Sequence, residues 1–338
     1  MTSNKQSIPQ KILAYLKGNP IVVMLALVSI AVGFTVDNFF SFANFNNLAS
    51  NTGVRFLIAL GVSGCLITKG TDLSAGRQAG LAACLTAILV QRADYAGRLY
   101  PSLPEMNMWV VLLVVLLIGA VIGAINGLII AVLNVPPFIA TLGTQTIIYG
   151  MALVLTDSQP IGGYQKEFVN ALSFKFLKAG EFPGIPVYVI IAIIFFIIFW
   201  FLYNKTTYGK YMYAIGGNEN AAEVSGVNTK KSKIIIYTIA GFMYAFAGYL
   251  LAAKSGGANA GLGQGYELEA IAGCTIGGVS TTGGIGTVGG ILVGVLVFEL
   301  LKVVLQFLGV NPYYNFIVQG LVIVTAVALD IRKYVKKK

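Results

Sequence analysis

The sequence predicts an all-α polytopic membrane protein with about ten transmembrane helices. Of its 338 residues, 57% are hydrophobic and only 11% are charged, and the mean hydropathy is +0.79. Long apolar stretches alternate with short polar intervals along the chain, and about 20 apolar residues are enough to cross a bilayer. This composition is typical of integral membrane proteins and argues against a soluble globular domain.

The whole chain, residues 1–338, is expected to form a single transmembrane domain. Two regions interrupt its pattern of spans, near residues 68–76 and 255–290, where charged residues and glycines predict broken or short helices. We predict spans at residues 20–36, 53–68, 74–91, 108–133, 138–155, 187–202, 234–252, 266–280, 287–306 and 314–330. Glycines recur every fourth residue at Gly119, Gly123 and Gly127 and again at Gly286, Gly290 and Gly294, which predicts close helix packing within the bundle.

Basic residues gather in the intervals that we expect on one side of the membrane. The net charge is +10, and the longest polar interval, residues 203–233, contains five lysines. Lysines close to the ends of spans favour the cytoplasmic side. An even number of spans then places the N- and C-termini there too, with the near-neutral intervals 92–107 and 156–185 outside. We expect these basic residues to interact with the headgroups of the lipid bilayer and not with nucleic acid.

The sequence contains no pattern that predicts catalysis or metal binding. There is no histidine, and the three cysteines, Cys65, Cys84 and Cys274, lie in apolar segments, so neither a disulfide framework nor a zinc site is expected. No G-x-x-x-x-G-K-[ST] motif is present, so we do not expect this chain to hydrolyse ATP itself. We therefore predict a protein that is not an enzyme and carries no cofactor.

The polar interval 203–233 is patterned in its middle. Gly216 and Gly217 predict a sharp turn with positive φ, and Asn218 is a good N-cap for a short helix over Glu219–Ser225. Gly226 would end that helix as its left-handed C′ residue. We therefore expect a compact cytoplasmic knob that binds a protein partner.

Polar residues inside or between the apolar spans are candidates for a translocation path. Neutral hydroxyls and amides suit a polyhydroxylated solute, although they also join helices to one another. The charged break at residues 69–78 has two interpretations. It lines a polar path, or it has only a structural role, in which Asp72 pairs with Arg77, or Asp72 or Ser74 caps the next helix. The candidates for the path are Asp72, Ser74, Asn126, Thr141 and Gln145.

Two further pairs of charges lie near the last spans. Glu299 and Lys302 are three residues apart on one helix and are expected to neutralise each other. Glu267 and Glu269 lie near the outer end of a short, weak span, and two interpretations are open: an acidic patch that docks an external partner, or a solvated loop. Gly64-Cys65…Gly76 is faintly similar to Gly273-Cys274…Gly284, which raises the hypothesis of an internal repeat.

Three stretches carry a family resemblance: GTDLSAG, NVPPFIATLGT and YGKYMYAIGGNENAAEVSGVN. In this order and spacing they resemble the permease subunits of bacterial ABC importers for monosaccharides, the family of the ribose, xylose, arabinose and galactose systems. The likeness covers nearly the whole chain. GTDLSAGRQAGLAA and the ending NPYYNFIVQGLVIVTAVALD look most like the galactose/methyl-galactoside branch of the family.

The resemblance implies a ten-helix subunit of the bacterial inner membrane that pairs with a second copy of itself. It also implies two cytoplasmic ABC ATPase subunits and a periplasmic sugar-binding protein. The knob then corresponds to the coupling helix, with the signature E-A-A-x-x-x-G, although Asn220 stands where glutamate is common. The residues expected to contact the ATPase are Gly216, Gly217, Asn218, Glu219, Asn220, Ala221, Ala222, Glu223, Ser225 and Gly226.

Three other functions remain open at this point. Within the family, a ribose or other pentose permease is the alternative. A secondary sugar transporter that works alone would need an ion- or proton-titrating group in its core, and such carboxylates are scarce. A membrane enzyme that acts on lipid-linked sugars would need catalytic groups that the sequence does not offer.

Overall fold

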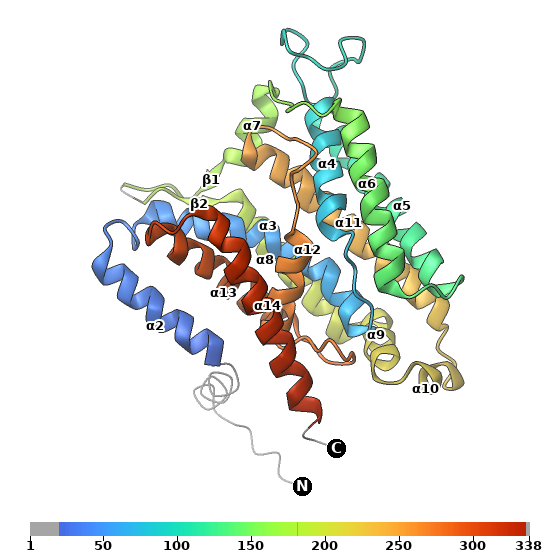
Figure 1. Ribbon diagram of the computed structural model, residues 1–338. Helices are drawn as coiled ribbons and strands as arrows, with labels where there is room; N and C mark the ends of the chain where they lie inside the picture. The colour runs from blue at the N-terminus through green and yellow to red at the C-terminus, as the bar shows by residue number, and fades with distance from the viewer. Residues whose placement is uncertain (1–19, 181, 336–338) are drawn as a thin grey trace.

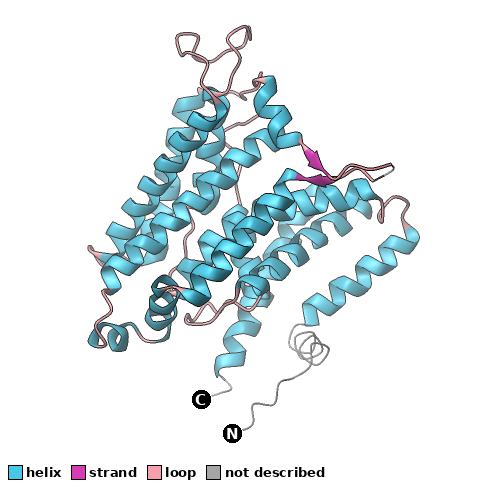
Figure 2. Ribbon diagram, turned by 180° about the vertical axis from the view of Figure 1, so that it is seen from behind, coloured by secondary structure: helices cyan, strands magenta, loops and turns pink. Residues whose placement is uncertain are grey.

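The computed structural model describes residues 20–180 and 182–335, which are almost entirely helical (Figures 1 and 2). The basic residues before residue 20 and the last three lysines lie outside the described residues. The helices are α2 (Pro20–Thr35), α3 (Phe42–Ile67), α4 (Ala75–Leu89), α5 (Met108–Ala131), α6 (Pro137–Thr156), α7 (Lys166–Ser173), α8 (Val187–Lys205), α9 (Thr207–Gly217), α10 (Glu219–Val224), α11 (Thr229–Ser255), α12 (Tyr266–Ile276), α13 (Val288–Phe307) and α14 (Pro312–Val335). Strands β1 (Lys175–Phe176) and β2 (Ile185–Pro186) form a small antiparallel hairpin next to α7 (Figure 2).

A helix lies in each of the ten intervals that the sequence predicts as spans. Within the described residues, six helices are long and apolar enough to cross a membrane: α3, α5, α6, α8, α11 and α13. The start of the second predicted span was wrong, because α3 begins at Phe42 rather than near residue 53. The Ser41 side chain caps this start by accepting from the Asn44 N–H, and Asn46 donates to the Gly184 carbonyl, so the polar stretch is stable as helix.

Helices α4 and α12 are too short to cross the membrane alone. At 1.5 Å per residue α4 is about 22 Å long and α12 about 16 Å, against roughly 30 Å of hydrocarbon. Non-helical segments, residues 68–74 and 256–265, lead into them from opposite ends of the molecule (Figure 1). The N-termini of α4 and α12 meet closely, since a Cβ on Gly76 would lie 2.3 Å from the Gly263 carbonyl oxygen. The predicted broken helices are therefore present.

Helices α3 and α12 end in the same way. Each closes with a Schellman turn whose C′ residue is left-handed, Lys69 (φ 63°) after α3 and Gly278 (φ 87°) after α12. The closing hydrogen bonds are Gly70 N–H to Cys65 O (2.8 Å) and Val279 N–H to Cys274 O (2.9 Å). The faint similarity of the two stretches thus corresponds to a shared turn.

Glycine faces hold the bundle together, as predicted. Helix α11 is central and packs against α3, α4 and α5. A Cβ on Gly123 of α5 would lie 2.2 Å from the Tyr237 carbonyl oxygen of α11, and a Cβ on Gly119 would lie 2.6 Å from that of Gly241. In the same way α13 approaches α12, where a Cβ on Gly294 would lie 1.9 Å from the Gly273 oxygen. Any larger side chain would push these backbones apart.

Candidate functional site

A group of buried polar side chains surrounds the start of α4. The Asp72 carboxylate is 1% exposed, and its Oδ1 accepts hydrogen bonds from the Ser74 backbone N–H (2.9 Å) and hydroxyl (2.6 Å). Its Oδ2 accepts from the Tyr244 hydroxyl of α11 (3.2 Å). We call this group the polar network; its members are Asp72, Ser74, Gln78, Asn126, Thr141 and Tyr244.

Two transmembrane helices complete the polar network. The Ser74 hydroxyl accepts from the side-chain amides of Gln78 (2.8 Å) and of Asn126 on α5 (3.0 Å). Thr141 on α6 accepts from the Leu73 N–H (3.1 Å) and donates to the Thr71 carbonyl (3.1 Å). Four of the five predicted path residues therefore meet at one point in the structure.

The remaining predictions for this region are only partly met. Gln145 lies one turn farther along α6, half-buried, and takes no part in the polar network. Asp72 does not pair with Arg77, whose guanidinium lies 4.1 Å from the Tyr149 ring centre and donates to the Ala260 carbonyl (3.2 Å). Ser74 is the N-cap residue of α4, but its side chain makes no capping bond.

The polar network holds the broken helix in place. Every member is buried, and the side-chain carbonyl oxygens of Gln78 and Asn126 have no hydrogen-bond partner among the described residues. Since irregular backbone at membrane depth needs protein groups to satisfy it, the network stabilises residues 68–74 in this conformation. It leaves two buried acceptors unused.

A second polar cluster links α3, α12 and α13. Arg55 contacts Glu269 (2.8 Å) and Glu299 (2.6 Å), and Lys302 contacts the same two carboxylates at 2.6 and 2.9 Å. Each cation therefore touches both anions, and the four side chains are neutral as a group. We call them the charge ring. The pairing of Glu299 with Lys302 that the sequence predicts is present within it.

Glu267 and Glu269 do not form an exposed acidic patch, contrary to that prediction. Glu269 belongs to the charge ring, with only 10% of its side chain exposed. Glu267 is 6% exposed and lies against Gly76 at the start of α4. The solvated-loop interpretation fails as well, because both residues lie in the first turn of α12. The positive end of that helix favours both carboxylates there, and the two cations of the charge ring hold Glu269.

Replacing Arg55 by methionine is expected to destabilise the protein by about 3–5 kcal/mol, because two buried carboxylates would then face one ammonium. Combining Arg55→Met with Glu299→Leu restores neutrality and should recover most of the loss. Thermal unfolding in detergent measures both. Arg92→Met, which removes an exposed pair with Asp94, serves as the control and should change little. A single Arg55→Met variant as stable as the parent would show that the ring does not hold these helices.

The interval 203–233 folds into two short helices at the end of the molecule where α14 also ends (Figure 1). Asn218 caps α10 as predicted, since its Oδ1 accepts from the Ala221 N–H (3.1 Å). Gly226 follows the C-cap residue with φ 88°, also as predicted. The expected turn at Gly216 and Gly217 was wrong, because both residues belong to α9.

Gly216 instead permits a very close contact between α9 and two breaks in the bundle, residues 68–74 after α3 and residues 277–287 before α13. A Cβ at Gly216 would lie 1.8 Å from the Ile67 carbonyl oxygen and 2.5 Å from the Gly284 nitrogen. Those two atoms are themselves joined, since the Gly284 N–H donates to the Ile67 carbonyl (2.8 Å). The end of α9 therefore touches both the segment after α3 and the segment before α13.

Side chains strengthen this three-way contact. The Lys69 ammonium donates to the Gly217 carbonyl (3.3 Å), which ties the end of α3 to the end of α9. The Tyr213 hydroxyl of α9 donates to the Gly286 carbonyl (2.8 Å). Burial raises the pKa of Tyr213 to about 12, so the hydroxyl keeps its proton at neutral pH. A displacement of α9 would thus act on both breaks at once.

Helix α10 presents one large apolar side chain to its surroundings. Val224 is 90% exposed, which is the highest value among the large hydrophobic side chains of the described residues. Ala222, predicted to face a partner, is 5% exposed and faces its own chain, whereas Ala221 is exposed. The sequence interpretation missed Val224. The available signal was that it is the only apolar residue larger than alanine in residues 218–226.

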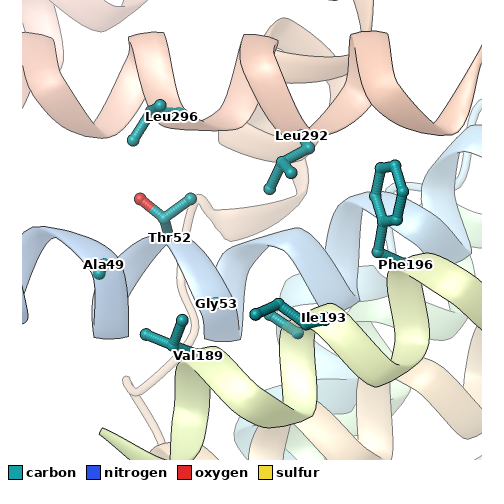
Figure 3. A pocket seen from close by; sticks show the side chains of 9 residues that line it. Ala49, Thr52, Gly53, Val189, Ile193, Phe196, Leu292 and Leu296 are labelled. Atoms are coloured by element: carbon teal, nitrogen blue, oxygen red, sulfur yellow. The ribbon is translucent and has the colours of Figure 1, made fainter. Parts of the chain in front are cut away.

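The chain also contains an apolar pocket between α3, α8 and α13, with a volume of about 300 Å³ (Figure 3). Val189, Ile193 and Phe196 of α8 face Leu292 and Leu296 of α13 across it. The Thr52 hydroxyl is a rare polar group there. This lining suits hydrocarbon rather than a polyhydroxylated ligand. Within the described residues, no group of His, Cys, Asp and Glu side chains could hold a metal ion.

Comparison with known proteins identifies the family. Residues 44–327 match the family described as "Branched-chain amino acid transport system / permease component". The galactose/methyl galactoside import permease protein of Escherichia coli (strain K12) is 47% identical over 331 residues, which cover 96% of this chain and 97% of the relative. Its counterpart in Haemophilus influenzae (strain Rd) is 46% identical over 329 residues, 96% of either chain.

Ribose permeases are similar too. The ribose import permease protein of Bacillus subtilis (strain 168) is 38% identical over 309 residues, 91% of either chain. No solved structure matches the chain significantly. The predicted resemblance to sugar permeases is therefore confirmed over nearly the full length. With its polytopic helical fold and its match over most of the sequence, the chain belongs to the family of branched-chain amino acid transport system permease components.

Proposed function

We propose that the chain is the permease subunit of an ATP-driven importer that carries a monosaccharide across the bacterial inner membrane. Galactose or a methyl galactoside is the proposed sugar, because relatives named for that activity are 46–47% identical over nearly the whole chain. Ribose is the alternative, since permeases named for it are 36–38% identical.

The observation that carries this proposal is the exposed helix α10. A short, capped helix with one protruding apolar side chain suits insertion into a groove of a cytoplasmic partner. Since the sequence contains no P-loop, an ATPase subunit would supply the hydrolysis. In this assignment Val224 and Ala221 contact the ATPase, while Ala222 seats α10 on the permease.

Glu219 and Glu223 are the acidic residues near Asn220, where the coupling-helix signature usually has glutamate. Glu219 forms an ion pair with Lys233 of α11 (2.6 Å), within the permease. Glu223 is exposed on α10. We therefore assign the contact with the ATPase to Glu223 rather than to Glu219.

The assembly that we propose contains two copies of the permease, two ATPase subunits and a periplasmic sugar-binding protein. The chain forms one transmembrane domain with ten crossings, and both termini and α10 face the cytoplasm. The lysines of residues 203–233 and the neutral intervals 92–107 and 156–185 support this orientation. In the structure, α10 and the end of α14 lie opposite the 92–107 connection (Figure 1).

The mechanism that we propose passes motion from α10 through α9 to the bundle. ATP binding closes the ATPase subunits and displaces α10 in each permease. Helix α9 then moves against Ile67, which precedes residues 68–74, and against Gly284, which lies within residues 277–287. Residues 68–74 and 277–287 are therefore the parts of the bundle that change conformation, and sugar passes beside them. ATP drives the change only because the ATPase binds the two conformations with different affinity.

Purification from the native membrane tests this proposal. The tagged chain would be extracted in mild detergent, and the copurifying proteins identified by mass spectrometry. An ATPase subunit in near-equal amount is the expected result. A chain that emerges without any nucleotide-binding partner at low salt would contradict the role of α10.

A further inference from the structure

The apolar pocket between α3, α8 and α13 is a groove on the side of the helix bundle (Figure 3). Its floor contains small residues of α3, Ala49 and Gly53, and its walls are large apolar side chains of α8 and α13. Ile193 on one wall is 54% exposed and Leu296 on the other is 40% exposed, so the pocket is open to the surroundings of the bundle. In a protein that spans a membrane, those surroundings are lipid hydrocarbon.

The size and lining of the apolar pocket suit a hydrocarbon chain. Val189 and Phe196 line the same wall and are seven residues apart on α8, so the pocket follows this helix for about 10 Å. One leaflet contributes roughly 15 Å of hydrocarbon to a bilayer, so this length matches a large part of one acyl chain. Water would need several polar partners, which the almost entirely apolar lining does not offer.

Helix α8 has the surface of a helix that faces lipid rather than another protein helix. Between Val187 and Tyr203, its only residue smaller than valine is Ala192, which is buried against Gly53 of α3. Helices that pack on one another in lipid use small residues at their contact. An acyl chain therefore fits this surface better than a second copy of the chain does.

The β1–β2 hairpin lies beside one end of the apolar pocket. The Asn46 side chain, about one turn before Ala49 on α3, donates to the Gly184 carbonyl of the hairpin (3.1 Å), and Pro186 of β2 is followed directly by α8. Lys175 is paired with Pro186 in the hairpin, is exposed, and forms no ion pair with any described residue. A lysine at a membrane surface attracts lipid phosphates.

Exposed apolar side chains indicate that the hairpin lies at the membrane surface. Phe174 and Phe176 are both exposed, with ring centres 4.8 Å apart, and Leu177 next to them is 76% exposed. The segment 174–186 contains two lysines and one glutamate, which gives it a net charge of +1. Large apolar side chains beside lysines are typical of segments in the headgroup region. The hairpin also extends sideways from the bundle (Figure 2).

We propose that the apolar pocket binds one acyl chain of a glycerophospholipid from the leaflet on the hairpin side, with the lipid phosphate next to the Lys175 ammonium. The acyl chain packs against α3, α8 and α13 at once, so the bound lipid stabilises the contact between these helices. The site requires only a phosphodiester and a hydrocarbon chain, which glycerophospholipids share. It does not depend on the solute that the permease carries.

Native mass spectrometry of the purified chain tests this proposal. The chain is delipidated in detergent, and dioleoylphosphatidylglycerol is added in increasing amounts. We expect one lipid per chain to bind well before any further lipid does. Ala49→Leu, which fills the floor of the pocket, should raise the dissociation constant of this lipid about tenfold or more. Lys175→Gln, which removes one ammonium at the surface, should raise it about fivefold.

Both substitutions have matched controls. Ala124→Leu enlarges a partly exposed alanine of α5 that does not line the pocket, and Lys166→Gln removes an exposed ammonium at the start of α7, outside the hairpin. These two variants should bind the lipid like the parent. Because Lys175 is exposed, its replacement leaves the fold intact, so this variant decides the test if Ala49→Leu does not fold.

Three results would overturn the proposal. The first is a parent chain that binds no single lipid ahead of the others. The second is a folded Ala49→Leu variant, or a Lys175→Gln variant, that binds the lipid like its control. The third is a change in the proportion of dimers in Ala49→Leu without a change in lipid binding, because the pocket would then be an interface between two copies of the chain.

Discussion

Val224→Asp is expected to abolish ATP-driven uptake and to release the ATPase subunit from the purified permease. The side chain is 90% exposed and supports nothing in its own chain, so the fold should keep its stability. An aspartate in an apolar groove of the partner would be buried without a counter-charge. We expect a loss of about 3 kcal/mol in association, roughly a hundredfold in affinity. Copurification and uptake in proteoliposomes measure the two effects.

Val224→Leu is the control for this prediction. It keeps an apolar side chain at the same position on α10, and it should retain the ATPase and most of the uptake. Equal amounts of both variants in the membrane would show that the difference arises in the partner contact. If the aspartate variant still binds the ATPase and transports sugar at the parental rate, α10 is not the coupling element.

Gly216→Val should have an effect of similar size for a different reason. Its Cβ would lie 1.8 Å from the Ile67 oxygen and 2.5 Å from the Gly284 nitrogen, both of them backbone atoms. Backbone atoms cannot rotate away as a flexible side chain does. The valine would therefore force α9 away from Ile67 and Gly284. We expect a destabilisation of about 1–3 kcal/mol and loss of uptake even where the ATPase still copurifies. Thermal unfolding and coupled uptake assays measure these quantities.

Gly217→Ala is the matched control for folding. Gly217 is the next residue of α9, and a Cβ there would have no atom within 4 Å. Alanine is also the better helix former, so the variant should unfold at the same or a slightly higher temperature. If Gly216→Val is as stable and as active as Gly217→Ala, the close contact of α9 with Ile67 and Gly284 does not occur in the membrane.

Much of the helical framework could be predicted, because apolar runs of about 20 residues and glycines four residues apart have a direct physical meaning in lipid. The α5–α11 contact at Gly119, Gly123 and Gly127 is one example. The helix caps at Asn218 and Gly226 could also be predicted, because each residue acts within a few positions of its own place in the chain. The meeting of Asp72, Ser74, Asn126 and Thr141 was anticipated as a group of polar residues at membrane depth, although not as hydrogen-bonded neighbours.

Two of the misses depended on contacts between residues far apart in sequence. Gly216 is typical of a turn in sequence, but a tertiary contact with Ile67 and Gly284 makes it a helical glycine. From the sequence, Glu269 was interpreted as an exposed acid. In the structure it pairs with Arg55, which lies more than 200 positions earlier in the chain. Val224 was missed for a local reason, because the interpretation gave no weight to the only apolar residue larger than alanine in residues 218–226. No periodicity in the sequence predicts the long-range contacts of Gly216 and Glu269.

The most direct test of the account is galactose uptake by the permease reconstituted with its copurified ATPase and a galactose-binding protein. We expect uptake to require ATP and to continue when ionophores collapse the proton and sodium gradients, and we expect Val224→Asp to eliminate it. Uptake that follows an ion gradient in the permease alone, without ATP, would contradict the account and identify the chain as a secondary transporter.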